Sequence, residues 1–143
     1  MSRKLKIKIK YHNVDPIEIL PQGDWIDLRT AERVHLEPGD FKVISLGVSM
    51  KLPEGYEAQI IPRSSTFARY GVLLANSMGL IDNSYSGTND IWRFPAYATK
   101  SITIEKNTRI CQFRLVRKQD PVEFEAVDEL DPVDRGGFGS SGV

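Results

Sequence analysis

Residues 4–11 have the sequence Lys4-Leu5-Lys6-Ile7-Lys8-Ile9-Lys10-Tyr11, in which every second side chain is a lysine. Successive side chains of a β-strand point to opposite faces, so this alternation predicts a strand with one buried and one solvated face. The same period of two, or a run rich in β-forming residues, recurs at residues 41–50, 56–61, 101–104, 109–117 and 122–126. The chain is therefore predicted to consist mainly of strands.

Turn-forming residues separate these runs at short intervals, as at Pro38-Gly39-Asp40, Pro53-Glu54-Gly55 and Lys106-Asn107. At most one short helix fits, around residues 65–70. Many short strands joined by short turns are typical of a sandwich, a jelly roll or a small barrel. We predict an all-β domain over residues 1–134, followed by a mobile, glycine-rich C-terminal segment over residues 135–143.

The composition narrows the classes of function. The 143 residues contain 19 Lys or Arg and 19 Asp or Glu, so no overall basic field favours binding to nucleic acid or to a membrane. The single cysteine, Cys111, cannot form an intrachain disulfide, which is typical of the reducing cytoplasm. The N-terminus has no continuous apolar run of the kind that signal peptides carry, and no run approaches membrane-spanning length.

Three polar segments have the chemistry to hold a phosphorylated ligand and its metal ion. The segment Gly23-Asp24-Trp25-Ile26-Asp27-Leu28-Arg29 places a carboxylate among apolar residues, where it could orient water on Mg²⁺, although an aspartate bonded to local turn amides is more common. In Pro62-Arg63-Ser64-Ser65-Thr66 an arginine precedes three hydroxyls, which suits phosphate oxygens and equally well the first turn of a helix. Gln112 could donate to a phosphate or could simply be solvated.

Residues 76–87 are predicted to form two strand ends around a hairpin. Within them the Asn76 amide could recognise the edge of a base, and Gly79 permits close approach of the backbone. Asp82 could act as a general base toward water, and Tyr85 could pack flat against a sugar ring. The alternative is a plain β-hairpin in which Asp82 only forms the turn.

The C-terminal segment carries its own set of donors. Arg135 offers a bidentate fork, the surrounding glycines expose backbone amides, and Phe138 supplies a ring. Ser140 and Ser141 add hydroxyl donors. A segment of this kind could fold over a phosphate ligand as a lid, and the alternative is a disordered terminus.

Taken in order, these segments resemble the five motifs of the trimeric dUTPase family. The resemblance extends from residue 24 to residue 142 and is carried by Asp24-Trp25-Ile26-Asp27-Leu28-Arg29, Pro62-Arg63-Ser64-Ser65, Gly79-Leu80-Ile81-Asp82-Asn83-Ser84-Tyr85-Ser86-Gly87, Arg109-Ile110-Cys111-Gln112 and Arg135-Gly136-Gly137-Phe138-Gly139-Ser140-Ser141-Gly142. The third motif is specific even when taken alone.

The resemblance implies a jelly-roll (β-clip-like) sandwich that assembles as a homotrimer. Each of three active sites would take the first, second and fourth motifs from one subunit, the third from another and the fifth from the last. The implied reaction is the hydrolysis of dUTP to dUMP and pyrophosphate in the cytoplasm, with Mg²⁺ carried mainly by the triphosphate. Such a reaction limits uracil incorporation into DNA and supplies dUMP for thymidylate synthesis.

The resemblance also implies a role for each matching residue. Asp82 would be the general base, and Asp27 would orient water on the metal ion. Uracil would be recognised by Asn76 and by the backbone near Leu80, while Phe138 would stack on the base. The implied substrate-binding set is Arg63, Ser64, Ser65, Asn76, Gly79, Leu80, Ile81, Tyr85, Gln112, Arg135, Phe138, Gly139, Ser140 and Ser141. Within it Arg63 is expected to organise the site more than to touch substrate.

Two departures from the family pattern leave alternatives open. The tail has two fewer residues between Arg135 and Phe138 than the family spacing. Residues 89–97 are unusually aromatic, so Trp92 or Phe94 could supply the lid ring, or could pack in the core or at a subunit interface. A dCTP deaminase shares the fold but lacks the third and fifth motifs, and a regulatory protein with a repressor-type partner, if the chain is of phage origin, is a further possibility.

Overall fold

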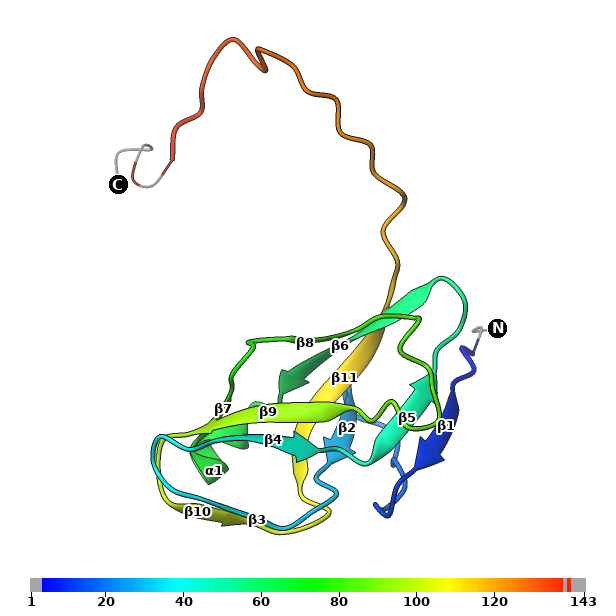
Figure 1. Cartoon of the computed structure of the whole chain (residues 1–143), viewed down its shortest axis with the longest axis vertical. Coiled ribbons are helices and arrows are strands. Elements are labelled where there is room, and N and C mark those ends of the chain that lie inside the picture. The colour runs from blue at the N-terminus through cyan, green and yellow to red at the C-terminus, as the bar shows by residue number, and fades with distance from the viewer. Residues whose placement is uncertain (1–3, 138, 140–143) are drawn as a thin grey trace.

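The structure, a computed structural model, describes residues 4–137 and 139, and these are almost entirely strands, turns and extended chain (Figure 1). The elements in chain order are β1 (Lys8–Tyr11), β2 (Ile26–Arg29), β3 (Val34–Leu36), β4 (Phe41–Ser45), β5 (Val48–Lys51), β6 (Tyr56–Pro62), α1 (Thr66–Tyr70), β7 (Val72–Leu74), β8 (Gly79–Ile81), β9 (Arg93–Ala98), β10 (Ile102–Ile104) and β11 (Arg109–Arg117). The prediction of an all-β chain with one short helix is confirmed. None of the helices in the described residues is long and apolar enough to cross a membrane.

The strands form four antiparallel sheets. The largest has the order β2-β11-β6-β8, and a second has the order β4-β9-β7. The pairs β1-β5 and β10-β3 make up the other two sheets. Neighbours within the two larger sheets are far apart in the chain, which is typical of a jelly roll rather than of a simple meander.

The core contains the aromatic residues that follow the third motif. Trp92 and Phe94 are 0% exposed, and the Trp92 ring meets Phe113 edge-on, with ring centroids 5.2 Å apart. Such edge-to-face pairs contribute beyond the area they bury. Core packing is therefore the role of both residues, and neither side chain is available as a lid ring in this structure.

Strand β11 matches the predicted strand over residues 109–117 at both ends. One departure occurs at its start, where the register with β2 shifts between Arg109 and Cys111, so that Ile110 and Cys111 are both buried. The predicted run over residues 41–50 is divided into β4 and β5 at Gly47, whose φ of +66° turns the chain. A Cβ there would lie 2.7 Å from that of Ala31, so this corner requires glycine.

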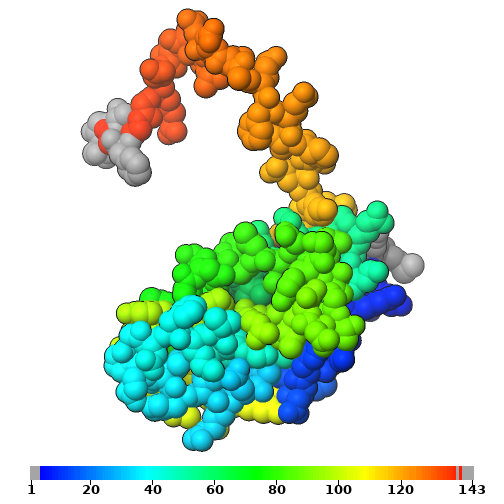
Figure 2. Space-filling view, in the orientation of Figure 1, coloured from blue at the N-terminus to red at the C-terminus, as the bar shows by residue number. Residues whose placement is uncertain are grey.

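The strand predicted over residues 122–126 is wrong for the isolated chain. Residues 118–137, which we call the C-terminal arm, have no regular secondary structure, and all of them are exposed. The arm leaves the body at the end of β11 and projects away from it (Figures 1 and 2). The alternating pattern is present, but no strand of the same chain lies beside it to supply backbone partners.

The predicted hairpin over residues 76–87 is also wrong. β7 pairs with β9, whereas β8 crosses to the other large sheet and pairs with β6. Gly79 makes this crossing possible, because a Cβ at that position would lie 3.0 Å from the Cβ of Ile60 on β6. The segment that carries the third motif is thus an edge strand of the β2-β11-β6-β8 sheet.

Candidate active site

The residues singled out from the sequence lie around two separate pockets. The first, which we call the Asp82 pocket, is lined by Asn76, Gly79, Leu80, Ile81, Asp82, Tyr85 and residues of the segment 91–95. The second, the Arg63 pocket, is lined by Asp27, Arg63, Ser64 and Gln112, with the loop 18–25 as its far wall. The structure therefore brings the third motif together in one place, and the first, second and fourth in another.

The Asp82 pocket is built on the pairing of β8 with β6. This pairing ends at Ile81 opposite Ala58, and Asp82 follows directly with its side chain exposed. The Leu80 side chain is 72% exposed, so the pocket offers an apolar edge beside the carboxylate. Asn76 lies in the preceding turn, in which Ser77 takes a positive φ of 65°. The pocket thus places an amide, strand backbone and a carboxylate along one edge.

Tyr85 has a fixed place in the same pocket. Its hydroxyl donates to the Ile91 carbonyl at 3.0 Å, and its backbone N–H donates to the Asp82 carbonyl at 3.0 Å. The side chain is still 38% exposed. The hydroxyl contact orients the ring while leaving much of the residue accessible, which suits packing against a ligand.

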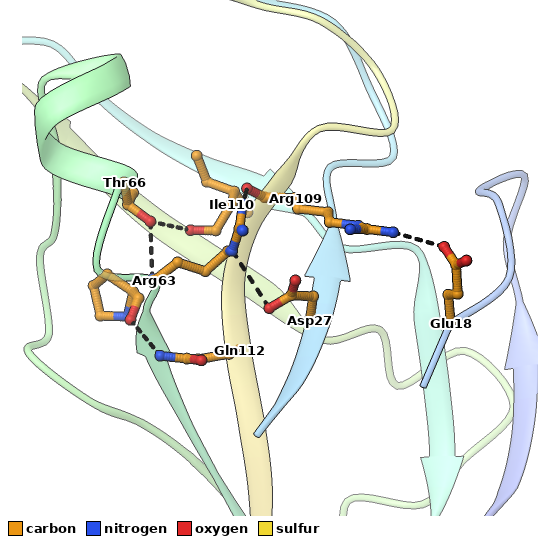
Figure 3. Close-up of polar contacts among 8 residues, drawn as sticks. Glu18, Asp27, Arg63, Thr66, Arg109, Ile110 and Gln112 are labelled. Carbon is orange, nitrogen blue, oxygen red and sulfur yellow. Dashed lines mark hydrogen bonds and ion pairs between the residues drawn. The ribbon is translucent and has the colours of Figure 1, made fainter. Parts of the chain in front are cut away.

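The Arg63 pocket is assembled by three neighbouring strands. Gln112 on β11 lies opposite Asp27 on β2 and opposite Ile61 on β6, so the register alone brings these positions together. Arg63 follows the end of β6, and its Nε lies 3.4 Å from Asp27 Oδ1 (Figure 3). The Gln112 amide donates to the Pro62 carbonyl at 3.1 Å. Gln112 is therefore anchored rather than simply solvated.

Residues 62–66 do lead into a helix, as the alternative interpretation predicted, but no serine side chain caps it. Ser65 occupies the N-cap of α1, yet its side chain makes no capping hydrogen bond. Thr66 makes the structural contacts instead: its buried hydroxyl accepts from the Arg63 N–H at 2.9 Å and donates to the Ile110 carbonyl at 2.8 Å (Figure 3). Thr66 thus joins the start of α1 to β11, and Ser64 lines the pocket.

Three arginines at this end of the sheet are each paired with a carboxylate. Arg109 lies 2.6 Å from a carboxylate oxygen of Glu18 (Figure 3), and Arg29 lies 3.6 Å from the same oxygen. Arg63 also donates to the Arg109 carbonyl at 3.2 Å, so it supports the backbone of the fourth motif. Sequence analysis missed Glu18, because it lies 91 positions from Arg109 and no local sequence pattern predicts their contact.

Cys111 takes no part in this chemistry. The thiol is fully buried, and burial raises its pKa because an ionised sulfur would lose its hydration. A thiol held neutral in this way is neither a nucleophile nor a metal ligand.

Among the described C-terminal residues, neither Arg135 nor Gly139 lines either pocket. Arg135 and Gly139 are exposed at the far end of the arm. Phe138, Ser140 and Ser141, which were also predicted to bind substrate, lie outside the described residues. The lid therefore stays a prediction.

The model of the dUTPase family matches residues 25–142 of this chain. The chain belongs to the dUTPase family.

Individual dUTPases agree with this assignment. The chain is 53% identical over 141 residues to the SPbeta prophage-derived deoxyuridine 5'-triphosphate nucleotidohydrolase of Bacillus subtilis, covering 97% of this chain and 99% of that protein. A dUTPase mutant of Staphylococcus bacteriophage 80alpha with dUpNHpp is similar in structure, with a TM-score of 0.78 at 26% identity, covering 96% of this chain and 99% of that one. A second structure shares the fold, with a TM-score of 0.75 at 20% identity over 87% of this chain and 97% of its own: a mutant dUTPase from phage phi11 of S. aureus that coordinates a structural Mg(II) ion.

The family assignment fits the arrangement of the two pockets. The third dUTPase motif forms the Asp82 pocket, and the first, second and fourth motifs form the Arg63 pocket. The sequence prediction of a dUTPase-type jelly roll is confirmed, while the role of each site residue stays a prediction.

The Thr66 hydroxyl provides a test of how the Arg63 pocket is held in place. Thr66→Val keeps the side-chain shape but leaves the Arg63 N–H and the Ile110 carbonyl without this partner. We expect the free energy of unfolding to fall by about 2–3 kcal/mol, because a polar group left unpaired in the interior costs about 1–3 kcal/mol. Urea denaturation measures the change. Thr66→Ser, the control, keeps the hydroxyl and is expected to cost about 1 kcal/mol for the lost methyl group; equal losses in the two variants would contradict this role.

Proposed function

We propose that this chain hydrolyses dUTP to dUMP and pyrophosphate, with Asp82 as the base that activates the attacking water. The observation that carries the proposal is the Asp82 pocket, in which an exposed carboxylate lies beside an amide, an edge strand and a fixed tyrosine. The 53% identical relative is named for the same activity.

Recognition of the base is assigned to the edge of β8. Strand β8 pairs with β6 along one edge only, and within the described residues it is the last strand of its sheet. Backbone groups at such an edge can donate to and accept from a uracil ring, and Asn76 adds an amide. Because these groups are held by the sheet, they cannot rearrange to accept the different donor pattern of cytosine. Tyr85 is assigned to the deoxyribose, where its ring leaves no room for a 2′-hydroxyl.

The triphosphate is assigned to the Arg63 pocket. Ser64 and Gln112 would donate to phosphate oxygens, with the backbone of Ser65 beside them, and Arg63 holds Asp27 and the fourth motif in place. Hydrolysis of a phosphoanhydride depends on positioning and on charge stabilisation more than on covalent chemistry by the protein. Arg63 is the basic side chain in the lining of the pocket and would contribute to the second requirement.

In the proposed reaction, water attacks the α-phosphorus while Asp82 accepts its proton. A bond forms between the water oxygen and the α-phosphorus. The bond from that phosphorus to the bridging oxygen breaks, and the pair of electrons leaves with pyrophosphate. The products are dUMP and pyrophosphate.

The residues of the Arg63 pocket fit a magnesium ion that arrives with the substrate. Within residues 4–137 and 139, no group of three or more acidic, histidine or cysteine side chains forms a cage for a metal ion. Asp27, with a side chain 16% exposed and paired with Arg63, can still accept hydrogen bonds from metal-bound water. When bound, Mg²⁺ would neutralise part of the triphosphate charge.

We further propose that the active sites are shared within a homotrimer. Asp82 and Ser64 line different pockets of one chain, so a complete site requires the Asp82 pocket of one subunit to face the Arg63 pocket of another. A ring of three subunits with closed heterologous contacts provides this arrangement three times.

The C-terminal arm supports this assembly. It contains no lysine or arginine between residues 119 and 134, but it carries the carboxylates Asp120, Glu123, Glu125, Asp128, Glu129, Asp131 and Asp134. Strand β1 has the opposite character: Lys8 lies directly opposite Lys51 of β5, a like-charge pair that is unfavourable without an acidic neighbour. An apolar groove formed in part by Ile7, Ile9 and Ile17 runs beside it. Residues 122–126 of a neighbouring subunit match this surface, because their apolar side chains suit the groove and their carboxylates suit the lysines of β1.

Residues 135–143 would then act as the lid of a neighbouring subunit's site, with Arg135 and the serines on the terminal phosphate. The boundary of the core domain at residue 134, the cytoplasmic location and a repressor-type partner stay predictions.

The activity is tested by pyrophosphate release with Mg²⁺, measured in parallel on dUTP, dTTP, dCTP and UTP. We expect rapid release from dUTP alone. A site that hydrogen-bonds uracil should disfavour dCTP by roughly 10⁴-fold, whereas the extra methyl of dTTP meets a steric barrier of about 10–200-fold or more. Equal rates on all four nucleotides would contradict the proposed recognition, and no release by folded protein would refute the reaction.

Asp82→Asn tests the proposed base. The amide keeps the shape of the side chain but cannot accept the proton, so we expect turnover to be lost while affinity for dUpNHpp is retained. Isothermal titration with dUpNHpp and steady-state kinetics separate the two effects. Glu54→Gln, which removes one exposed carboxylate from a surface turn, is the control and should leave both unchanged. Retained turnover in Asp82→Asn would assign the base elsewhere.

Subunit mixing tests the shared sites. Asp82→Asn and the double variant Ser64→Ala/Gln112→Ala each damage one of the two pockets. When the two are unfolded together and refolded at equal amounts, about one quarter of the sites in a random trimer would combine two undamaged pockets. We therefore expect activity to reappear in the mixture and not in either variant refolded alone. Mixed trimers without activity would show that each site lies within one subunit.

A further inference from the structure

Asn83, the residue after Asp82, makes two long-range hydrogen bonds that no sequence pattern predicted. Its Nδ2 donates to the Pro53 carbonyl at 2.9 Å and to the Tyr56 carbonyl at 2.8 Å. These acceptors precede it by 30 and 27 residues, and the side chain is half-buried between them. Asn83 therefore ties the segment after β8 to the turn before β6.

The geometry is specific for an amide. The NH₂ group of asparagine has two hydrogens, and the two carbonyl oxygens use both. An aspartate has the same shape but only accepts hydrogen bonds, so it would direct its oxygens at two other acceptors. Replacement of one atom type thus converts two attractive contacts into two repulsive ones.

The turn that accepts these bonds is itself held to the sheet. The Tyr56 N–H donates to the Pro53 carbonyl at 3.2 Å, and Gly55 provides the positive φ of +85° that the turn requires. The Lys118 N–H donates to the Gly55 carbonyl at 2.9 Å, and the Arg117 guanidinium lies 5.1 Å from the centre of the Tyr56 ring. The anchor for Asn83 is therefore the rigid β6-β11 pair.

Asn83 is also the point at which the segment after Asp82 is fixed to the body. On the N-terminal side, Asp82 is held by the pairing of Ile81 with Ala58. On the C-terminal side, the other hydrogen bonds of residues 82–91 stay within that segment: Tyr85 to Asp82, Tyr85 to Ile91, and Gly87 with Asp90. Among the described residues, the next hydrogen bonds to the body occur at Trp92, which pairs with Val48 and Leu46.

We propose that Asn83 is a positioning residue for the reaction, which holds the backbone at Asp82 so that its carboxylate keeps the geometry of proton transfer. This inference rests on the proposed role of Asp82. In a variant at Asn83, the displaced Asp82 carboxylate would still lie in the pocket. The groups assigned to bind uracil and the phosphates would be unaltered. The effect is therefore expected in kcat rather than in substrate affinity, because a misplacement of about 1 Å can cost about 100-fold in rate.

The test compares Asn83→Asp, Asn83→Ala and Asn83→Ser with the control Ser84→Ala, which alters the neighbouring exposed side chain. We expect kcat for dUTP to fall by about 10- to 100-fold in Asn83→Ala and at least as far in Asn83→Asp. Asn83→Ser, which retains one hydroxyl donor, should lose less, and Ser84→Ala should retain full activity. Affinity for dUpNHpp should stay within about threefold of the parent in all of them, since binding uses other groups. Urea denaturation fixes the conditions in which every variant is fully folded, and rates are compared there.

A double-mutant comparison separates positioning from a general loss of structure. If Asn83 acts through Asp82, Asn83→Ala should change the residual rate of Asp82→Asn by less than about twofold, because the group that it positions is already absent. The same fold loss in both backgrounds, or a kcat of Asn83→Ala within about twofold of the parent, would overturn the inference. A parent protein that hydrolyses dUTP and an Asp82→Asn variant with only a small residual rate would leave the proposed function intact in either case.

Discussion

Strand β6 fixes the positions of both pockets, because it is paired along both of its edges. On one edge it pairs with β11 from Pro62 opposite Cys111 to Tyr56 opposite Arg117, and on the other it pairs with β8. The first pairing sets Gln112 opposite Ile61, two residues before Arg63, while the pairing of β11 with β2 sets Gln112 opposite Asp27. The second sets Leu80 and Asp82 at the sheet edge. A one-residue slip of β6 would turn its side chains to the opposite face and misplace both pockets, so the register is the constraint on which the site depends.

Basic and acidic residues are equal in number, but they lie on different parts of the chain. Lysines gather on and before β1, and carboxylates gather on the arm. Each concentration costs energy in the isolated chain, as the like-charged pair of Lys8 and Lys51 illustrates. Such costs are offset when a surface of opposite charge covers them. The opposite charges of β1 and the arm therefore favour the association of subunits that we propose.

The sequence predicted local structure well where the chain supplies its own partners. The alternation in residues 109–117 predicted β11 to the residue, because this strand lies between β2 and β6 of the same chain. The same alternation in residues 122–126 failed, since periodicity shows which face a strand would bury but not where its partner comes from. The hairpin over residues 76–87 failed for a related reason: turn residues predict a reversal of direction, and here the chain crosses instead to a different sheet.

The candidate site was predictable only in part, and the same distinction explains why. Asp82, Arg63 and Gln112 stand in motifs whose spacing is local and therefore visible in the sequence. Glu18 and Asn83 act through contacts that span 91 and 30 positions, and a solitary carboxylate or amide gives no local signal of them. The burial of Trp92 and Phe94 was likewise open until the packing of the core, with Trp92 against Phe113, was known.

In the trimer that we propose, association and catalysis would depend on the same surfaces of this chain. On the sheet β4-β9-β7, Phe41 and Leu73 lie on either side of Tyr97, and all three side chains are more than 40% exposed. A row of this kind is typical of a surface that another protein covers. Strand β9 also supplies Arg93 and Pro95 to the Asp82 pocket, so a subunit that covers the row would lie next to the proposed base. In the trimer that we propose, the contacts that stabilise assembly would therefore also complete the site and exclude water from it. A chain of only 143 residues would in this way form a closed active site from two pockets that are open in the single subunit.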